Sequence, residues 1–256
     1  MEEICAKLII MRIIIFLLFV SSSLFSMELD SVPSVASAPV GVGVRAFPPD
    51  DSPHSSRYFF GPTAYNLNQG EGYFQNTWLL INQVSYGLSD NFSMGVGVVP
   101  LFLFGISASP VWITPKLSIP MEGDRGALGA GGLMGTVFGQ QNTGFGILYG
   151  IGTVGSRDVN ATLGLGYGYA GGSWGRRPAI SLSGLYRTSA RWAIQTENYY
   201  LQTGDEVVFI MSFGGRWMGP SIAIDFGIVR PVLGGSSNNY LGLPWLSITA
   251  PFGMTE

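Results

Sequence analysis

The sequence predicts an all-β protein whose antiparallel strands close into a transmembrane barrel of about twelve strands. Three observations lead to this fold class. After residue 57, bulky apolar residues alternate with glycine or polar residues at a two-residue period, which is the repeat of a β-strand. Charged residues make up only 11% of the chain, against roughly 25% in soluble domains. Glycine accounts for 37 of the 256 residues, about twice its usual share of ~7%.

The clearest alternation lies at residues 163–169, which read Leu-Gly-Leu-Gly-Tyr-Gly-Tyr. A helix would distribute the large side chains around its circumference, whereas a strand places all of them on one face and the glycines on the other. Long strands that are apolar on one face and small or polar on the other are typical of a barrel wall that stands in lipid.

The first 56 residues are expected to lie outside the barrel wall. Residues 1–27 are predicted to be a secretory signal peptide, because a positive charge at Lys7 and Arg12 accompanies an apolar core at 8–20 and small residues follow. An uncleaved membrane anchor is the alternative. Residues 28–56 are rich in Pro, Ser, Ala and Asp and lack a sustained period, which predicts a flexible segment that hangs free or plugs the lumen.

The remaining region, residues 57–256, is predicted to form the barrel. We expect strands near residues 58–65, 73–87, 92–104, 110–119, 127–138, 145–155, 161–170, 178–188, 191–201, 206–217, 221–231 and 243–252. Each strand with its connection takes about 16 residues, and a membrane strand needs ~9–11, so the spacing is compatible with ten to fourteen strands.

The connections between these strands alternate in character. Tight turns are expected at 88–91, 188–191 and 218–221, and looser glycine-rich or polar links at 139–144, 171–177 and 233–242. If the first strand rises from the periplasm, the tight turns lie on the periplasmic side and the looser links outside, which is the asymmetry of bacterial outer-membrane barrels.

Two other folds compete with this prediction. A helical membrane protein would use the uncharged segments 91–115 and 126–156, but the first contains three prolines and the second contains eleven glycines. Each glycine costs a helix interior about 1 kcal/mol relative to alanine. A soluble β-sandwich would also alternate, although its polar face should carry many more charges.

Five charged residues fall on the expected lumen side of the strands and are the candidate site residues: Lys116, Arg187, Glu197, Arg216 and Asp225. One interpretation is that these charges pair and hold a narrow interior closed. The other is that they line a pore and set its ion preference. Eight aromatic residues near expected strand ends are interpreted as interfacial girdles: Tyr58, Phe59, Trp78, Trp192, Tyr199, Tyr200, Trp217 and Trp245.

The sequence predicts no catalytic, cofactor or metal site. Residues 150–155 fit the G-x-G-x-x-G pattern, but an alternating segment follows where a phosphate loop needs a helix. His54 is the only histidine and lies in the flexible segment, which is poorly placed for a hydrolase base. A net charge of −3 gives no reason to expect nucleic acid. We therefore expect a protein that is not an enzyme.

Three runs, residues 60–66, 86–97 and 155–168, resemble bacterial outer-membrane β-barrel proteins, in which a Tyr-Gly-Leu-(Ser/Thr)-Asp strand end leads into a tight periplasmic turn. The resemblance implies a place in the outer membrane of a Gram-negative-type bacterium, surrounded by its lipid. It assigns no functional residues. The leading hypothesis is a small passive or weakly selective channel for small solutes or ions. The alternative is a non-enzymatic barrel that stabilises the envelope or binds a partner.

Overall fold

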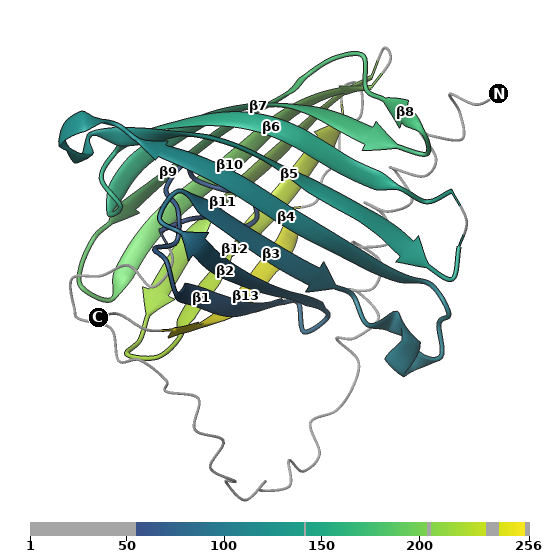
Figure 1. Cartoon of the computed structure of the whole chain (residues 1–256), viewed down its shortest axis with the longest axis horizontal. Coiled ribbons are helices and arrows are strands. Elements are labelled where there is room, and N and C mark those ends of the chain that lie inside the picture. The colour runs from purple at the N-terminus through teal and green to yellow at the C-terminus, as the bar shows by residue number, and fades with distance from the viewer. Residues whose placement is uncertain (1–54, 141, 204–205, 234–240, 254–256) are drawn as a thin grey trace, which may run out of the picture. The chain divides into compact units, whose positions relative to one another are not determined.

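The computed structural model describes residues 55–140, 142–203, 206–233 and 241–253 (Figure 1). The predicted signal peptide, His54 and nearly all of the predicted flexible segment lie outside the described residues. Among those described, no helix is long and apolar enough to cross a membrane.

Twelve antiparallel strands form one closed barrel within the described residues (Figure 1). They are β1 (Glu71–Thr77), β2 (Ile81–Ser89), β3 (Phe92–Val98), β4 (Ser109–Pro120), β5 (Gly126–Phe138), β6 (Phe145–Gly155), β7 (Val159–Ala170), β9 (Ala179–Arg187), β10 (Trp192–Thr203), β11 (Glu206–Met218), β12 (Ala223–Leu233) and β13 (Leu243–Gly253). Each strand pairs with its neighbours in the chain, and β1 pairs with β13 to close the ring. The predicted fold class and strand number are confirmed.

Three short elements lie outside this wall. The two-residue strand β8 (Ser173–Trp174) pairs only with the end of β7. Two 3₁₀ helices lie in connections, η2 (Leu101–Phe104) between β3 and β4 and η3 (Glu122–Asp124) between β4 and β5. The expected strand 92–104 was therefore too long, because the wall strand ends at Val98 and η2 follows it.

The strand number is right although two of the expected strands are wrong. The segment expected as one strand at 73–87 is a hairpin, β1 and β2, whose turn residues Trp78 and Leu79 have φ values of 51° and 62°. Two positive φ values are typical of the turn that matches the twist of paired strands, and Gly, Asn or Asp usually occupies it. No such residue occurs here, so the sequence hid the turn. The segment expected as a strand at 58–65 is not part of the wall, and the two errors cancel.

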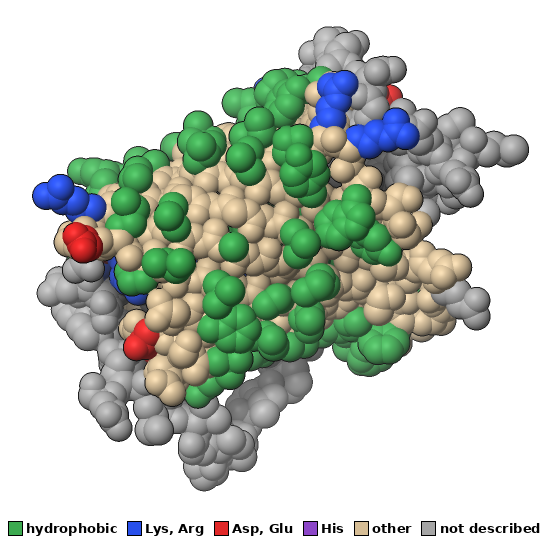
Figure 2. All heavy atoms as spheres, turned by 45° about the horizontal axis from the view of Figure 1, so that its top comes forward, with side chains coloured by type: hydrophobic (Ala, Val, Ile, Leu, Met, Phe, Trp, Pro, Cys, Tyr) green, Lys and Arg blue, Asp and Glu red, His purple; other side chains and the backbone are tan. Residues whose placement is uncertain are grey.

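The two faces of the wall differ as predicted. Large apolar side chains cover the outside, and in Figure 2 the charged side chains lie toward the ends of the molecule. On β11, Phe213 is 65% exposed while the neighbouring Ser212 is buried, and on β4 Leu117 is 56% exposed beside the buried Lys116. Since exposed apolar surface costs roughly 25 cal/mol per Å² in water, this belt belongs in lipid.

Because consecutive strands run in opposite directions, their connections lie alternately at the two ends of the barrel. The connections after β2, β4, β6, β9 and β11 lie at one end, together with the start of β1 and the close of β13. We call it the short-turn end, and the opposite end, with the links after β5, β7 and β12, the long-loop end. The three predicted tight turns lie at the short-turn end and the three predicted looser links at the other, although the links after β1 and β10 at the long-loop end are also short.

Residues 55–67 lie inside the barrel, and we call them the inner segment. Its backbone folds back on itself, because the Tyr58 amide donates to the Gly61 carbonyl at 2.9 Å and the Thr63 amide donates to the Ser56 carbonyl at 3.0 Å. Most of its residues are buried. Its bulky aromatic residues suggested a strand, but the Gly61-Pro62 pair turns the chain before it can join the sheet.

Candidate functional site: the barrel interior

Lys116 on β4 binds the inner segment through its backbone. The Lys116 Nζ donates to the carbonyl oxygens of Tyr65 at 2.6 Å and of Ser56 and Thr63 at 3.3 Å each. The side chain is buried. An ammonium has three protons to donate, so the three carbonyl oxygens satisfy it where water cannot reach.

Glu197 on β10 binds the backbone of the same segment by the opposite chemistry. Its Oε2 accepts from the amide of Phe60 at 2.9 Å, and its Oε1 accepts from the amide of Gly61 at 2.7 Å. The Tyr199 hydroxyl also donates to Oε1. A Cβ at Gly61 would lie 2.5 Å from the Tyr199 hydroxyl and 2.9 Å from Oε1, so this close approach requires glycine.

Arg216 on β11 is the third side chain that holds the segment. Its Nη2 donates to the carbonyl oxygens of Tyr58 at 3.1 Å and Arg57 at 3.2 Å. Its Nε forms a 2.6 Å ion pair with Asp225 Oδ1, directly opposite on β12, and Ser247 donates to Asp225 Oδ2. Arg216 and Asp225 are 0% and 1% exposed. A buried pair of this kind is stable only when further hydrogen bonds satisfy both partners, as they do here.

Side chains of the inner segment add neutral contacts with the wall. The Tyr58 hydroxyl donates to Asn160 Oδ1 and lies 2.7 Å from the Thr162 hydroxyl. Burial raises the pKa of Tyr58 above its ordinary value, which keeps the phenol protonated. Phe59 packs edge-to-face on Trp245 with 5.7 Å between ring centroids. The segment is therefore anchored by both its backbone and its side chains.

The girdle interpretation of the aromatic residues was wrong for some of them. Tyr58, Phe59 and Trp245 are buried inside the barrel, and Tyr199 lines its interior, whereas Trp192 is exposed on the outside. An aromatic residue near a strand end has the same sequence signature on either face. Whether it points inward or outward depends on the register of the strand. A two-residue period fixes that register only when the face of at least one side chain is already known.

Contacts with the inner segment and between facing strands leave one part of the interior solidly packed, and we call it the packed region. Its inward-facing side chains are at most 2% exposed: Thr153, Thr162, Gln195, Glu197, Arg216, Asp225, Ser247 and Thr249. Most of them lie within five residues of the short-turn end.

The rest of the interior is hollow and contains a cavity of about 320 Å³. Its lining combines small residues, such as Ser85, Gly95, Thr114, Gly164 and Ser181, with large aliphatic ones, such as Leu133, Ile147 and Ile210, and most of its surface is apolar. Larger lining groups are Tyr73, Tyr149 and Tyr199, and the inner segment contributes Arg57, Phe60, Gly61 and Pro62. Among the described residues that line the cavity, the charged ones are Arg57 and Lys116, and none is acidic.

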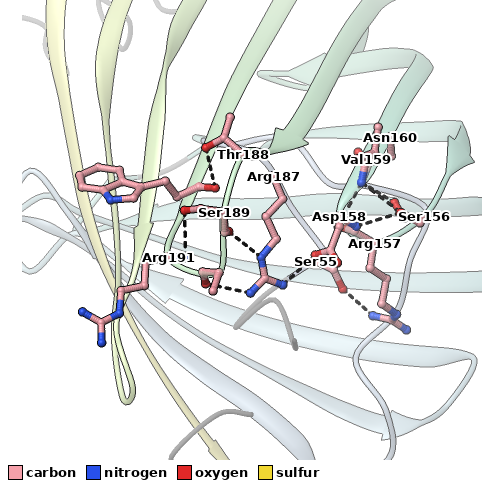
Figure 3. Close-up of polar contacts among 12 residues, drawn as sticks. Ser55, Ser156, Arg157, Asp158, Val159, Asn160, Arg187, Thr188, Ser189 and Arg191 are labelled. Carbon is pink, nitrogen blue, oxygen red and sulfur yellow. Dashed lines mark hydrogen bonds and ion pairs between the residues drawn. The ribbon is translucent and has the colours of Figure 1, made fainter. Parts of the chain in front are cut away.

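The structure brings four of the five candidate site residues to the inner segment. Lys116, Glu197 and Arg216 contact it, and Asp225 pairs with Arg216. Arg187 lies elsewhere, at the short-turn end, where its Nη1 forms a 3.0 Å ion pair with Asp158 (Figure 3). Its other nitrogens donate to the carbonyl oxygens of Ser189 and Ala190. Arg187 thus fastens two neighbouring turns together.

Sequence reasoning missed Arg57, because it read the inner segment as the first strand of the wall. The signal that was available is the Gly61-Pro62 pair, which interrupts an apolar run where a membrane strand would continue. Residues 150–155, which fit the phosphate-loop pattern, lie within β6 and lead into another strand. Among the described residues, no cluster of His, Cys, Asp and Glu side chains is suited to a metal ion.

The chain has little sequence likeness to known proteins: no protein-family model and no curated protein matches it. Its fold is similar to solved structures of porins. The KdgM porin has a TM-score of 0.48 at 7% identity, covering 73% of this chain and 99% of that one. The NanC porin has a TM-score of 0.40 at 13% identity, covering 73% and 98%. The KdgM porin has also been solved in complex with disordered oligogalacturonate.

A third similar structure is the outer-membrane protein Omp33 of Acinetobacter baumannii, with a TM-score of 0.35 at 7% identity, covering 72% and 96%. The architecture of the chain itself decides the location. It has an even number of antiparallel strands, an apolar outer belt, and short turns at the end where the wall begins and finishes. The protein is an outer-membrane β-barrel. Such barrels belong to bacteria of the Gram-negative type.

Proposed function

We propose that the protein is a passive channel for small solutes or ions, and that the inner segment closes it in the conformation described above. The observation that carries this proposal is the division of one interior into a hollow cavity and a packed region. A barrel that serves only as an envelope component has no need of a hollow interior. Twelve strands enclose more space than the eight-stranded barrels that side chains fill completely.

The candidate charges have different tasks in the closed and open channel. In the closed form Lys116, Glu197 and Arg216 make seven hydrogen bonds to the backbone of the inner segment. If the segment withdraws, the same three charges face water in the lumen, where rings of charge set ion preference. The two interpretations of these residues, structural pairing and selectivity, therefore describe two states of one channel.

The experiment that tests the proposal is conductance in a planar bilayer, measured on the full-length protein and on a variant that lacks the inner segment, residues 55–67. Heat-modifiable migration in gels verifies that each form is a folded barrel. We expect rare openings from the full-length protein and steady conductance from the variant. Steady conductance from both would show that the segment does not close the pore. Silence from both folded forms would contradict the channel and favour the structural or partner-binding barrel.

A further inference from the structure

Arg57, on the inner segment, is a buried cation without a matching anion. Its side chain is 6% exposed and lines the cavity. One nitrogen, Nη2, donates to the Phe59 carbonyl at 2.7 Å, and Nε has no hydrogen-bond partner. The guanidinium carbon lies 5.8 Å from the centroid of the Tyr73 ring, a cation–π contact that supplies no compensating charge.

Lys116 places a second cation at the same cavity. Neither Lys116 nor Arg57 forms an ion pair with a carboxylate among the residues that the structure describes. Arg216 is an internal contrast, because it is buried as deeply and is paired with Asp225 at 2.6 Å. The packed region thus neutralises its buried cation, and the cavity does not.

An uncompensated buried charge is unfavourable unless a counter-charge or hydrogen-bond acceptor reaches it. The cavity has room for such a group, since about 320 Å³ lies within the range of small-molecule sites. A carboxylate or phosphate group matches the geometry of a guanidinium that lacks a counter-charge, and it also gains from the nearby ammonium. Tyr149 in the same wall offers an aromatic face and a hydroxyl.

We propose that the cavity is a binding site for a small anion bearing carboxylate or phosphate groups, with the Arg57 guanidinium and the Lys116 ammonium as its two positive charges. The inference rests on the proposed channel function, because it names the class of solute that enters this cavity. Since Arg57 belongs to the inner segment and Lys116 to the wall, the bound anion contacts both.

Binding is tested on the full-length protein in detergent, by thermal unfolding in increasing citrate or, separately, inorganic phosphate at constant ionic strength. We expect a saturable rise in Tm with at least one of the two anions. Arg57→Gln should weaken the apparent affinity at least tenfold, and Arg187→Gln, which removes a cation outside the cavity, should leave it unchanged. The absence of a saturable rise in the wild-type protein, or an equal rise in Arg57→Gln, would overturn the proposal.

A second pair of variants tests the site without altering any group that holds the inner segment. Thr114 lines the cavity, so Thr114→Glu supplies an internal carboxylate and should weaken anion binding at least tenfold. Thr114→Gln adds similar bulk without charge and should bind as the wild type does. Equal binding by these two variants would contradict an electrostatic site. Because binding needs no open pore, saturable binding with silent bilayers would refute the channel alone, and conductance without binding would refute the anion site alone.

Discussion

The packed region and the cavity share one wall and one alternating pattern, yet their interiors differ. Both have small and polar residues on their inward faces, and the cavity has large aliphatic ones as well. In the packed region, contacts with the inner segment and a buried ion pair leave the side chains fully enclosed. In the cavity, the segment forms only part of the lining, and two cations face a hollow. The comparison teaches that an inward charge in a barrel is structural where an opposite charge meets it and a candidate for function where no opposite charge does.

The largest expected effect comes from removing Asp225, the ion-pair partner of Arg216 in the packed region. Asp225→Ala leaves Arg216 buried without its counter-charge and should lower the free energy of unfolding by about 3–5 kcal/mol. Denaturant unfolding of the refolded barrel measures the loss. The double variant Arg216→Met, Asp225→Leu is the matched control and should recover much of it. A single variant as stable as the wild type would show that the ion pair does not support the packed region.

Glu197→Gln should loosen the inner segment. The side-chain amide of glutamine has only one oxygen, so its NH₂ group would face one of the two backbone N–H groups that now donate to the carboxylate. Hydrogen bonds to charged groups contribute about 1.5–3 kcal/mol. Since about 1.4 kcal/mol changes an equilibrium tenfold, the open fraction in a bilayer should rise at least tenfold. Unchanged opening frequency in a folded variant would contradict the role of Glu197 in closing the channel.

Tyr58→Phe removes the hydroxyl that contacts Asn160 and Thr162 and should cost about 1–3 kcal/mol of unfolding free energy at neutral pH. Burial raises the pKa of the folded Tyr58 above the value of about 10 that it has when unfolded. Its contribution is therefore complete below pH 10 and lost as the pH rises above it. The stability difference between wild type and variant should shrink in alkaline solution, and a constant difference would argue against a buried phenol.

Arg187→Gln should have the smallest effect. Its ion pair with Asp158 lies at the short-turn end, and the Asp158 side chain is 42% exposed. Pairs that reach solvent contribute about 0.2–1 kcal/mol, and salt screens them. Denaturant unfolding at low and high salt measures how much Arg187→Gln lowers the free energy of unfolding, for comparison with the much larger decrease expected for Asp225→Ala. A loss as large as that of Asp225→Ala would show that this partly exposed ion pair stabilises the barrel as much as the buried pair in the packed region does.

The sequence by itself determined most of the wall. The alternation at residues 163–169 predicts β7, and the same period predicts most other strands. A two-residue period is enough to predict strands because successive side chains of a strand must point to opposite faces. The pattern also predicted that Ser212 and Arg216 share the inner face of β11 and Phe213 the outer face.

Tertiary structure alone decided what fills the wall. The turn at Trp78 and Leu79 forms without a turn residue, because pairing with both neighbouring strands holds β1 and β2 in register. The inner segment leaves the sheet because Lys116, Glu197 and Arg216, from three separate strands, satisfy its backbone in place of a neighbouring strand. A local pattern reports the direction of each side chain but not which distant group meets it. The roles of Arg57 and Asp225 therefore follow from the closed barrel and not from the alternation.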